Sequence, residues 1–216
     1  MNNLQKRILT SLFILPFSFF FIIKGGYILM FFLFLIFSLT NYELFSAFNK
    51  KSTILFLDLL LITSLFSIFY LAEKNESTFL ILLWVLILCI CSDIGGYIFG
   101  KIFKWKKLTK ISPKKTFSGV FGSFIFSIFS LFIISNLPIK DSININFLEV
   151  KFFFLAIIFS LIAQIGDLII SYFKRLEKIK DAGKFLPGHG GILDRIDGLM
   201  FVVIFTTIFY NLNIIP

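Results

Sequence analysis

Residues 78–100 read TFLILLWVLILCICSDIGGYIFG, an apolar run of 23 residues in which Asp93 is the only charged side chain. A helix of that length rises about 34 Å, which is enough to cross a hydrocarbon core about 30 Å thick. The apolar residues are continuous, whereas a barrel strand would alternate apolar and polar side chains, so a helix is the spanning structure that fits. Similar apolar runs occupy residues 8–23, 27–48, 54–72, 117–135, 152–173 and 196–215.

The composition of the whole chain agrees with a membrane protein. Of the 216 residues, 58% are hydrophobic and 15% are charged, and the mean hydropathy is +0.95. Soluble domains have about 45–50% apolar and about 25% charged residues, so a soluble enzyme, a disordered regulator and a secreted disulfide scaffold are excluded. Cys89 and Cys91 lie inside an apolar run, where we expect them to pack rather than to bind metal. The predicted fold is an all-α, polytopic integral membrane protein with about seven transmembrane helices, and residues 1–216 form one transmembrane domain.

The basic residues are distributed unevenly between the loops. The chain has 21 lysines and arginines and a net charge of +9, which in a soluble protein would raise the question of nucleic acid. Most of them, however, lie before the first apolar run or in every second loop after it, so we expect no nucleic-acid partner. The exceptions are Lys24, Lys74, Lys140 and Lys151. By the positive-inside rule, the N-terminus and the basic loops face the cytoplasm and the C-terminus faces outward.

The location that follows is the inner (cytoplasmic) membrane of the cell, which the chain crosses several times with its basic loops facing the cytoplasm. A cleaved signal peptide is the alternative for residues 1–23. The sequence Ile23-Lys24-Gly25-Gly26 lacks the small-residue pattern of a cleavage site, and we expect a membrane span there.

Polar residues and glycines gather in two segments, 92–123 and 164–198, which we expect to be active-site blocks at the cytoplasmic face. In the first, Asp93 lies within an apolar run, where an ionisable side chain is costly and indicates a functional site. Gly96 and Gly100 share its helix face and would let a neighbouring helix approach closely. The alternative is that Asp93 pairs with a lysine for structural reasons.

The first segment also contains Ser112-Pro113-Lys114-Lys115-Thr116 directly before the run 117–135. Two ammonium groups, two hydroxyls and the positive end of a helix are suited to bind a polyphosphate. For most lysines of residues 101–115 we expect the simpler role of anchoring the loop at anionic headgroups. The glycine spacing of a nucleotide-hydrolase loop is absent from this stretch.

The second segment places carboxylates at helical spacing. Asp167, Ser171 and Lys174 are spaced i, i+4 and i+7, and Asp194 and Asp197 lie three residues apart. Three carboxylates at a membrane surface repel one another, and a divalent cation such as Mg²⁺, which prefers oxygen ligands, would relieve the repulsion. The alternative is that Asp194 and Asp197 merely stabilise a helix N-terminus. We expect His189, the single histidine, to contact phosphate or a metal ligand rather than to act as a base.

These residues resemble the signature of the phosphatidate cytidylyltransferase family, also called CDP-diacylglycerol synthases. The matching pattern is Ser171-x-Phe173-Lys174-Arg175, then Lys180-Asp181-x-Gly183, then Leu186-Pro187-x-His189-Gly190-Gly191-Ile192-x-Asp194-Arg195-Ile196-Asp197. Two further blocks are similar to the family's, and they are Ser92-Asp93-x-Gly95-Gly96-Tyr97 through Ser112-Pro113-Lys114-Lys115-Thr116, and Gln164-x-Gly166-Asp167. One departure is Phe117-Ser118-Gly119, where the family usually has Trp-Glu-Gly.

The resemblance implies an integral membrane enzyme that condenses CTP with phosphatidic acid to CDP-diacylglycerol and diphosphate. It implies dependence on Mg²⁺, with room for a second, monovalent cation such as K⁺. Asp167 and Asp194 match the family's metal-binding carboxylates, with Asp197 beside them, and Lys174 and Arg175 complete the expected catalytic set. The residues expected to contact substrate are Asp93, Ser112, Lys114, Lys115, Thr116, Ser171, Lys180, Asp181, His189, Gly190, Gly191 and Arg195.

Two other classes of function stay open from the sequence. A CTP-dependent lipid kinase, or a cytidylyltransferase acting on ether or isoprenoid lipids, would use the same kind of site. A membrane transporter or scaffold would also explain carboxylates inside a membrane, although the sequence lacks an inverted repeat and a pair of broken helices. The expected partners are CTP, phosphatidic acid and the lipid bilayer, with room for a homodimer.

Overall fold

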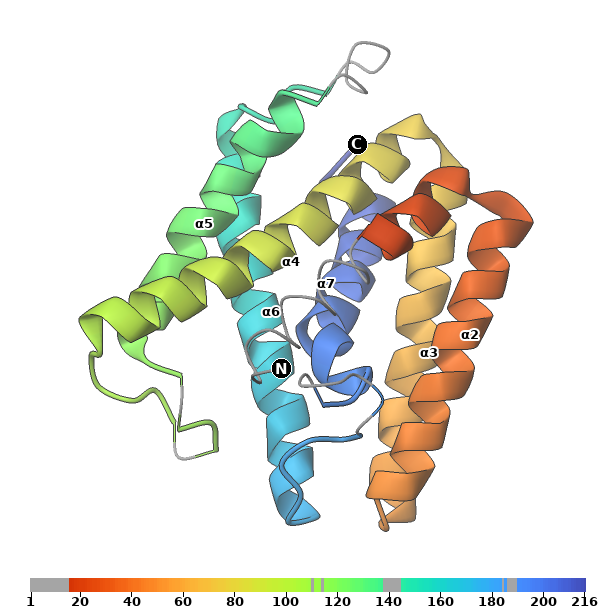
Figure 1. The fold of residues 1–216 in the computed structure, drawn as a ribbon. Coiled ribbons are helices and arrows are strands. Elements are labelled where there is room, and N and C mark those ends of the chain that lie inside the picture. The colour runs from red at the N-terminus through yellow and green to blue at the C-terminus, as the bar shows by residue number, and fades with distance from the viewer. Residues whose placement is uncertain (1–15, 110, 114, 138–144, 184, 186–189) are drawn as a thin grey trace.

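The computed structural model describes residues 16–109, 111–113, 115–137, 145–183, 185 and 190–216, and these ranges are helical with connecting turns (Figure 1). Residues 16–24 form a helix that precedes the six labelled ones. The labelled helices are α2 (Gly26–Ala47), α3 (Lys51–Lys74), α4 (Glu76–Phe103), α5 (Phe117–Ser135), α6 (Val150–Leu176) and α7 (Leu193–Asn211). Within the described residues there is no strand, and Lys107 and Thr116 form an isolated antiparallel bridge. The predicted all-α fold is confirmed.

Five of the described helices, α2 to α6, are long and apolar enough to cross a membrane, which confirms a polytopic protein. α7 begins with the charged residues Asp194, Arg195 and Asp197, and it is not among these five. The first half of the first predicted span, residues 8–23, lies outside the described residues. Seven spans and a cytoplasmic N-terminus therefore stay predictions.

Local sequence explains where the central helices begin and end. Asn75 caps α4, because its side chain accepts a hydrogen bond of 2.7 Å from the Thr78 backbone N–H while the Thr78 hydroxyl accepts one from Asn75 N–H. Thr116 caps α5 by accepting from Gly119 N–H at 3.1 Å. α4 ends where Lys104 takes a left-handed conformation with φ of 48°. Lys104 and Thr116 thus mark the two ends of the loop between α4 and α5.

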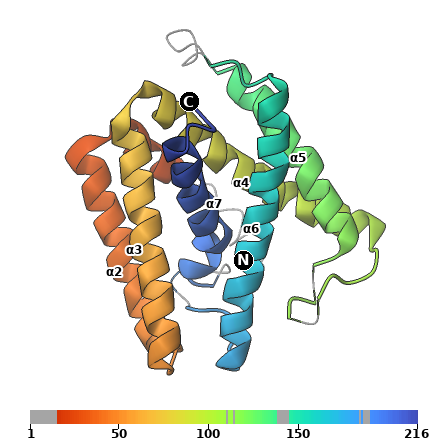
Figure 2. The same ribbon diagram turned by 180° about the vertical axis from the view of Figure 1, so that it is seen from behind.

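α4 is the central helix of the bundle and crosses it obliquely (Figures 1 and 2). In the apolar 18-residue stretch of α4, 56% of the residues are buried inside the protein, whereas the corresponding share for α2 is 22%. Trp84 lies at the centre of the core, fully buried among the rings of Phe147, Phe152 and Phe159. Its indole N–H donates to the Ser130 hydroxyl of α5 at 3.1 Å, so the polar atom of this buried ring is paired.

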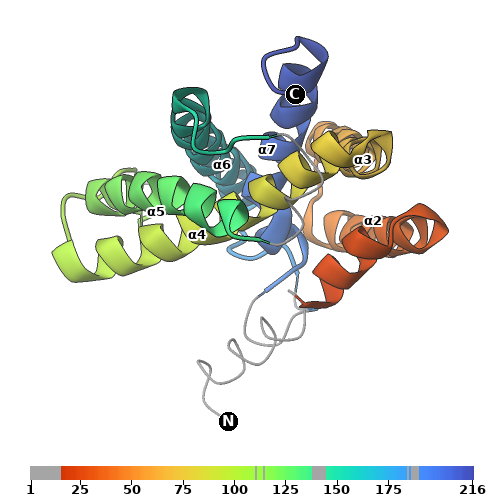
Figure 3. The same ribbon diagram turned by 90° about the horizontal axis from the view of Figure 1, so that it is seen from above.

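α5 lies against α4 along an interface of small residues, and this pair of helices projects to one side of the bundle when seen from above (Figure 3). A Cβ atom at Gly119 would lie only 2.9 Å from the Gly96 carbonyl oxygen, and one at Gly96 would lie 2.7 Å from the Ser123 hydroxyl. The prediction that Gly96 allows a close helix approach is confirmed. A Cβ at Gly100 would lie 3.2 Å from the Thr116 hydroxyl, so this glycine faces the same interface.

Three connections rich in basic residues meet at one end of the bundle. They are the α2–α3 connection, the loop between α4 and α5, and the connection between α6 and α7 (Figure 1). The Arg175 guanidinium donates to the Ile111 carbonyl at 3.3 Å, and Lys50 N–H donates to the Glu177 carboxylate at 3.2 Å. This end of the bundle carries the candidate site, and its cytoplasmic orientation stays a prediction.

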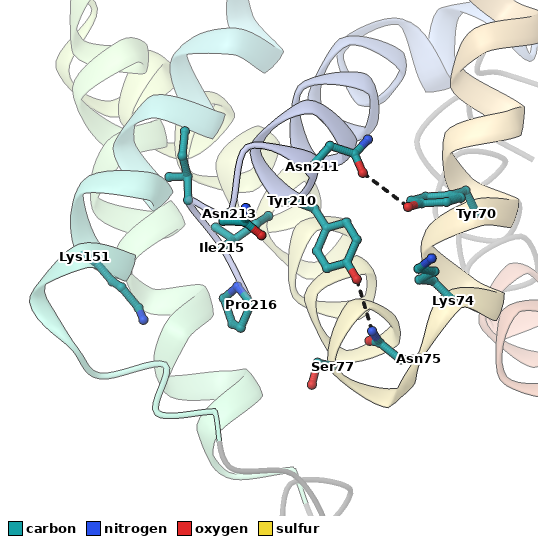
Figure 4. A pocket seen from close by; sticks show the side chains of 11 residues that line it. Tyr70, Lys74, Asn75, Ser77, Lys151, Tyr210, Asn211, Asn213, Ile215 and Pro216 are labelled. Atoms are coloured by element: carbon teal, nitrogen blue, oxygen red, sulfur yellow. Dashed lines mark hydrogen bonds between the residues drawn. The ribbon is translucent and has the colours of Figure 1, made fainter.

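A polar pocket of about 610 Å³ lies at the opposite end of the bundle, where α3 and α7 end and α6 begins (Figure 4). Tyr70 and Tyr210 lie in its wall, hydrogen-bonded to Asn211 and Asn75 respectively. Its cationic lining residues are Lys74 and Lys151. None of the predicted site residues lines it, so the pocket is separate from the candidate site.

Candidate active site

The inner face of α6 carries the first part of the site. The Ser171 hydroxyl donates to Asp167 Oδ1 at 3.2 Å, which confirms that residues spaced by one turn stack on one face. One turn further along the helix, Lys174 is only 5% exposed. A lysine with so little contact with water requires nearby carboxylates, and α7 supplies them.

Lys174 joins α6 to the first turns of α7. Its ammonium lies 2.7 Å from Asp194 Oδ1 and 3.8 Å from Asp197 Oδ2. Both carboxylates therefore project from the same face of α7, as their spacing of three residues predicts. Because the Lys174 and Asp194 side chains are 7% and 5% exposed, this ion pair is shielded from water and depends on both partners.

Lys115 brings the loop between α4 and α5 into the site. Its ammonium lies 2.6 Å from Asp167 Oδ2 and donates to the Gln164 carbonyl at 3.2 Å. The Lys115 side chain is 22% exposed, so it keeps access to the surrounding solvent. The first and second polar segments, about 50 residues apart in the chain, thus meet at Asp167.

Two carboxylates lie next to each other between these lysines. The Asp197 side chain is within hydrogen-bonding range of Asp167, and its Oδ1 accepts from Gly198 N–H at 2.8 Å. The result is a continuous series of contacts, here called the charge chain. Its members, in order, are Lys115, Asp167, Asp197, Lys174 and Asp194.

Asp93 and Arg195 lie at the border of the charge chain. Asp93, on α4, is within electrostatic range of Asp167, Lys115 and Arg195. With these two residues included, four carboxylates face three cationic side chains, which leaves one negative charge when all are ionised. The cluster is therefore suited to accept a further cation.

Asp194 has a second set of partners that fix the connection before α7. Its Oδ2 accepts from the backbone N–H groups of Ala182 and Gly191, each at 2.9 Å. Together with Lys174, these donors surround the carboxylate. Asp194 therefore holds the α6–α7 connection in place.

Of the three predicted metal ligands, Asp167 and Asp197 lie close enough together to share a cation. Within the described part of the chain, no three His, Cys, Asp or Glu side chains are grouped closely enough to hold a metal together. The structure brings Asp167 and Asp197 together, whereas Asp194 is turned towards Lys174 and the loop amides because it lies in the first turn of α7. Adjacent carboxylate oxygens are the ligands that Mg²⁺ prefers.

Several predicted substrate residues have structural partners. Thr116 caps α5, and its hydroxyl also lies 3.0 Å from that of Ser118. The Ser112 carbonyl accepts from Lys115 N–H at 3.0 Å, which forms the turn that directs Lys115 towards the site. Lys180 and Asp181 are exposed on the connection after α6. Gly190 and Gly191 adjoin the Asp194 carboxylate. Lys114 and His189 lie outside the described residues.

Arg175 was predicted to belong to the catalytic set, and its contacts in the structure are with backbone carbonyls. Its guanidinium donates to Ile179 at 2.6 Å and to Ile111 at 3.3 Å. Arg175 thus links the two basic connections, and its predicted catalytic role stays a prediction.

One residue of this region was missed by the sequence reasoning. Glu43 on α2 is 1% exposed, and its Oε2 accepts from Leu193 N–H, the first residue of α7, at 3.2 Å. The signal was present in the sequence, because Glu43 is the only charged residue in the apolar run 27–48. An isolated carboxylate in such a run indicates a specific partner.

Comparison with known proteins gives one family. The profile of the Cytidylyltransferase family matches residues 48–213, which contain the whole charge chain. The phosphatidate cytidylyltransferase of Rickettsia typhi is 38% identical over 144 residues, which are 66% of this chain and 62% of that protein. Those of Staphylococcus saprophyticus and Haemophilus influenzae are 38% and 40% identical over 62% and 60% of this chain, and 50% and 45% of their own lengths. The chain thus spans between 45% and 62% of the length of these relatives.

Proposed function

Because the chain belongs to the cytidylyltransferase family, we propose that it transfers the cytidylyl group of CTP to phosphatidic acid, forming CDP-diacylglycerol and diphosphate. The observation that carries this proposal is the charge chain. It joins all three sequence blocks of the family pattern at one end of a membrane bundle, where a lipid headgroup and a soluble nucleotide can both arrive.

The reaction needs two anionic groups to come together. An oxygen of the phosphatidate phosphate attacks the α-phosphorus of CTP, the bond from that phosphorus to the bridging oxygen breaks, and diphosphate leaves. Positioning and neutralisation of charge supply most of the rate in such a transfer. Lys115, which is partly exposed, is the ammonium best placed to exchange its carboxylate partner for a phosphate of CTP.

Lys174 has a different role in this proposal. Its side chain is 7% exposed and is shared by Asp194 and Asp197, so it orients these carboxylates and is shielded from direct contact with a large substrate. Arg175 keeps the two basic connections together while substrates bind.

The cation that the family uses would be held by Asp167 and Asp197, with Asp194 connected to them through Lys174. Mg²⁺, when bound there, offsets the negative charge that develops on the transferring phosphates. A second, monovalent cation such as K⁺ stays a prediction of the family resemblance.

The site faces the cytoplasm in this proposal, in the inner membrane of the cell. The basic connections that surround the charge chain favour the cytoplasmic side by the positive-inside rule, which is also the side where CTP is available. A homodimer stays a prediction.

The proposal is tested with detergent-purified protein mixed with CTP and phosphatidate, with and without Mg²⁺. We expect diphosphate release that depends on both substrates and on the cation. Release of CDP without diphosphate would identify a lipid kinase, and activity restricted to ether or isoprenoid lipids would identify a related synthase. Absence of any nucleotide turnover with all of these lipids would contradict an enzyme and favour a transporter or scaffold.

A further inference from the structure

The first turn of α7 lacks a side-chain cap of its own. Its N-cap residue is Ile192, whose side chain cannot accept a hydrogen bond, and no side-chain cap is formed there. The first N–H groups of a helix have no partner within the helix, and a buried end requires acceptors from elsewhere. This end matters because Asp194 and Asp197 lie one and four residues after Leu193.

Glu43 supplies the missing acceptor from α2, 150 positions away in the chain. Its Oε2 accepts from Leu193 N–H at 3.2 Å. The same carboxylate faces the backbone N–H groups of Ile192 and Phe185. A carboxylate beside the positive end of a helix is favourable, which accounts for an acidic residue inside an otherwise apolar span.

The connection before α7 is closed around this carboxylate. A Cβ atom at Gly183 or at Gly191 would overlap the Glu43 side chain. These two glycines are therefore required by the presence of Glu43, and they also belong to the family pattern of the sequence. Glu43 lies before residue 48, where the family match begins.

Two carboxylates thus hold the start of α7. Asp194 holds Ala182 and Gly191 by their N–H groups, and Glu43 holds Leu193. We infer that Glu43 is a positioning residue of the active site: it fixes the first turn of α7 so that Asp197 stays beside Asp167. Glu43 acts through the backbone and touches no substrate. Its effect on turnover rests on the proposed function, whereas its effect on the backbone does not.

The first measurement is hydrogen exchange of the purified full-length chain without substrates or metal. In E43A, the amides of residues 190–197 should exchange about tenfold faster or more, because a hydrogen bond to a charged acceptor is lost. E43Q keeps a neutral acceptor, and its exchange in this segment should be about threefold to fivefold faster. Both changes should be confined to this segment.

The control is E73A, which removes another carboxylate that accepts a backbone N–H, that of Gly26 at 2.7 Å. It should leave exchange of residues 190–197 unchanged. Should E43A fail to fold, E43Q carries the test alone. The inference is overturned if folded E43Q shows wild-type exchange in residues 190–197, or if its exchange rises equally in α4 and α5.

The second measurement is turnover as a function of Mg²⁺ concentration. A positioning role predicts an apparent Mg²⁺ requirement about tenfold higher in E43A, with an intermediate value in E43Q and an unchanged KM for phosphatidate. A lower kcat at an unchanged Mg²⁺ requirement would contradict the link from Glu43 to the Asp167–Asp197 pair. If the protein turns over no CTP at all, the proposed function fails, while the exchange measurement still decides the role of Glu43.

Discussion

Replacement of Asp194 by asparagine tests the central ion pair of the site. In the native protein, Asp194 Oδ1 lies 2.7 Å from the buried Lys174 ammonium, and its Oδ2 accepts from two backbone N–H groups. Asparagine has the same shape but only one acceptor oxygen. If that oxygen faces Lys174, the amide NH₂ is directed at two N–H donors, and Lys174 loses its closest counter-charge.

The size of the effect follows from burial. Breaking a buried pair by removing one partner costs about 3–5 kcal/mol, because the other charge stays uncompensated. We therefore expect Asp194→Asn to lower the free energy of unfolding in detergent by about that amount, and cytidylyl transfer to be lost because the start of α7 is no longer fixed. Lys174→Met should be destabilising for the same reason.

The double variant Asp194→Asn with Lys174→Met separates stability from catalysis. The double variant leaves neither Lys174 nor Asp194 as an unpaired buried ion, although Asp197 loses its 3.8 Å contact with Lys174. Its loss of stability should therefore be smaller than the sum of the single losses by about 1–3 kcal/mol. Activity should stay absent. Strictly additive losses of stability would refute the reasoning, because they would mean that Lys174 and Asp194 do not interact as described. Full activity of Asp194→Asn would overturn its assignment to the site.

Three further predictions concern single positions. Lys115→Ala should raise the apparent KM for CTP about tenfold or more, because a charge-assisted contact is lost. Lys101 is an exposed lysine over the Tyr97 ring, and Lys101→Ala should leave this KM unchanged. Equal KM values for the two variants would mean that Lys115 is only a membrane anchor. Asp197→Asn should raise the Mg²⁺ concentration for half-maximal turnover about tenfold or more, since one of two adjacent ligands becomes neutral; an unchanged requirement would remove Asp197 from the cation site. Gly119→Ala should destabilise the protein by about 1–3 kcal/mol, because the added Cβ meets a backbone carbonyl at 2.9 Å. In Gly100→Ala the added Cβ meets a hydroxyl at 3.2 Å, and the loss of stability in the same thermal unfolding assay should be smaller.

Periodicity alone predicted the parts of the structure that depend on one helix. The range 117–135 coincides with α5, and the stacking of Ser171 on Asp167 follows from their spacing. The close approach at Gly96 was also predictable, because small residues at helical spacing allow contact between backbones.

Contacts between helices were harder to predict, since they depend on how the bundle packs. Spacing indicated that Asp194 and Asp197 share a face, but it could not indicate that Lys174 separates Asp194 from Asp167. Arg175 was expected in the catalytic set, and spacing could not indicate that its guanidinium also bridges two connections through carbonyl groups. The isolated carboxylate of Glu43 indicated a polar partner, but no local pattern could identify that partner as a backbone N–H 150 residues away.

The transfer reaction is tested most directly by following the phosphates of CTP into the products. CTP labelled at the α-phosphate should transfer its label to chloroform-soluble lipid in the presence of phosphatidate and Mg²⁺, whereas CTP labelled at the γ-phosphate should release its label as diphosphate. Label from the γ-phosphate in the lipid, or no labelled lipid from either nucleotide, would contradict cytidylyl transfer at this site.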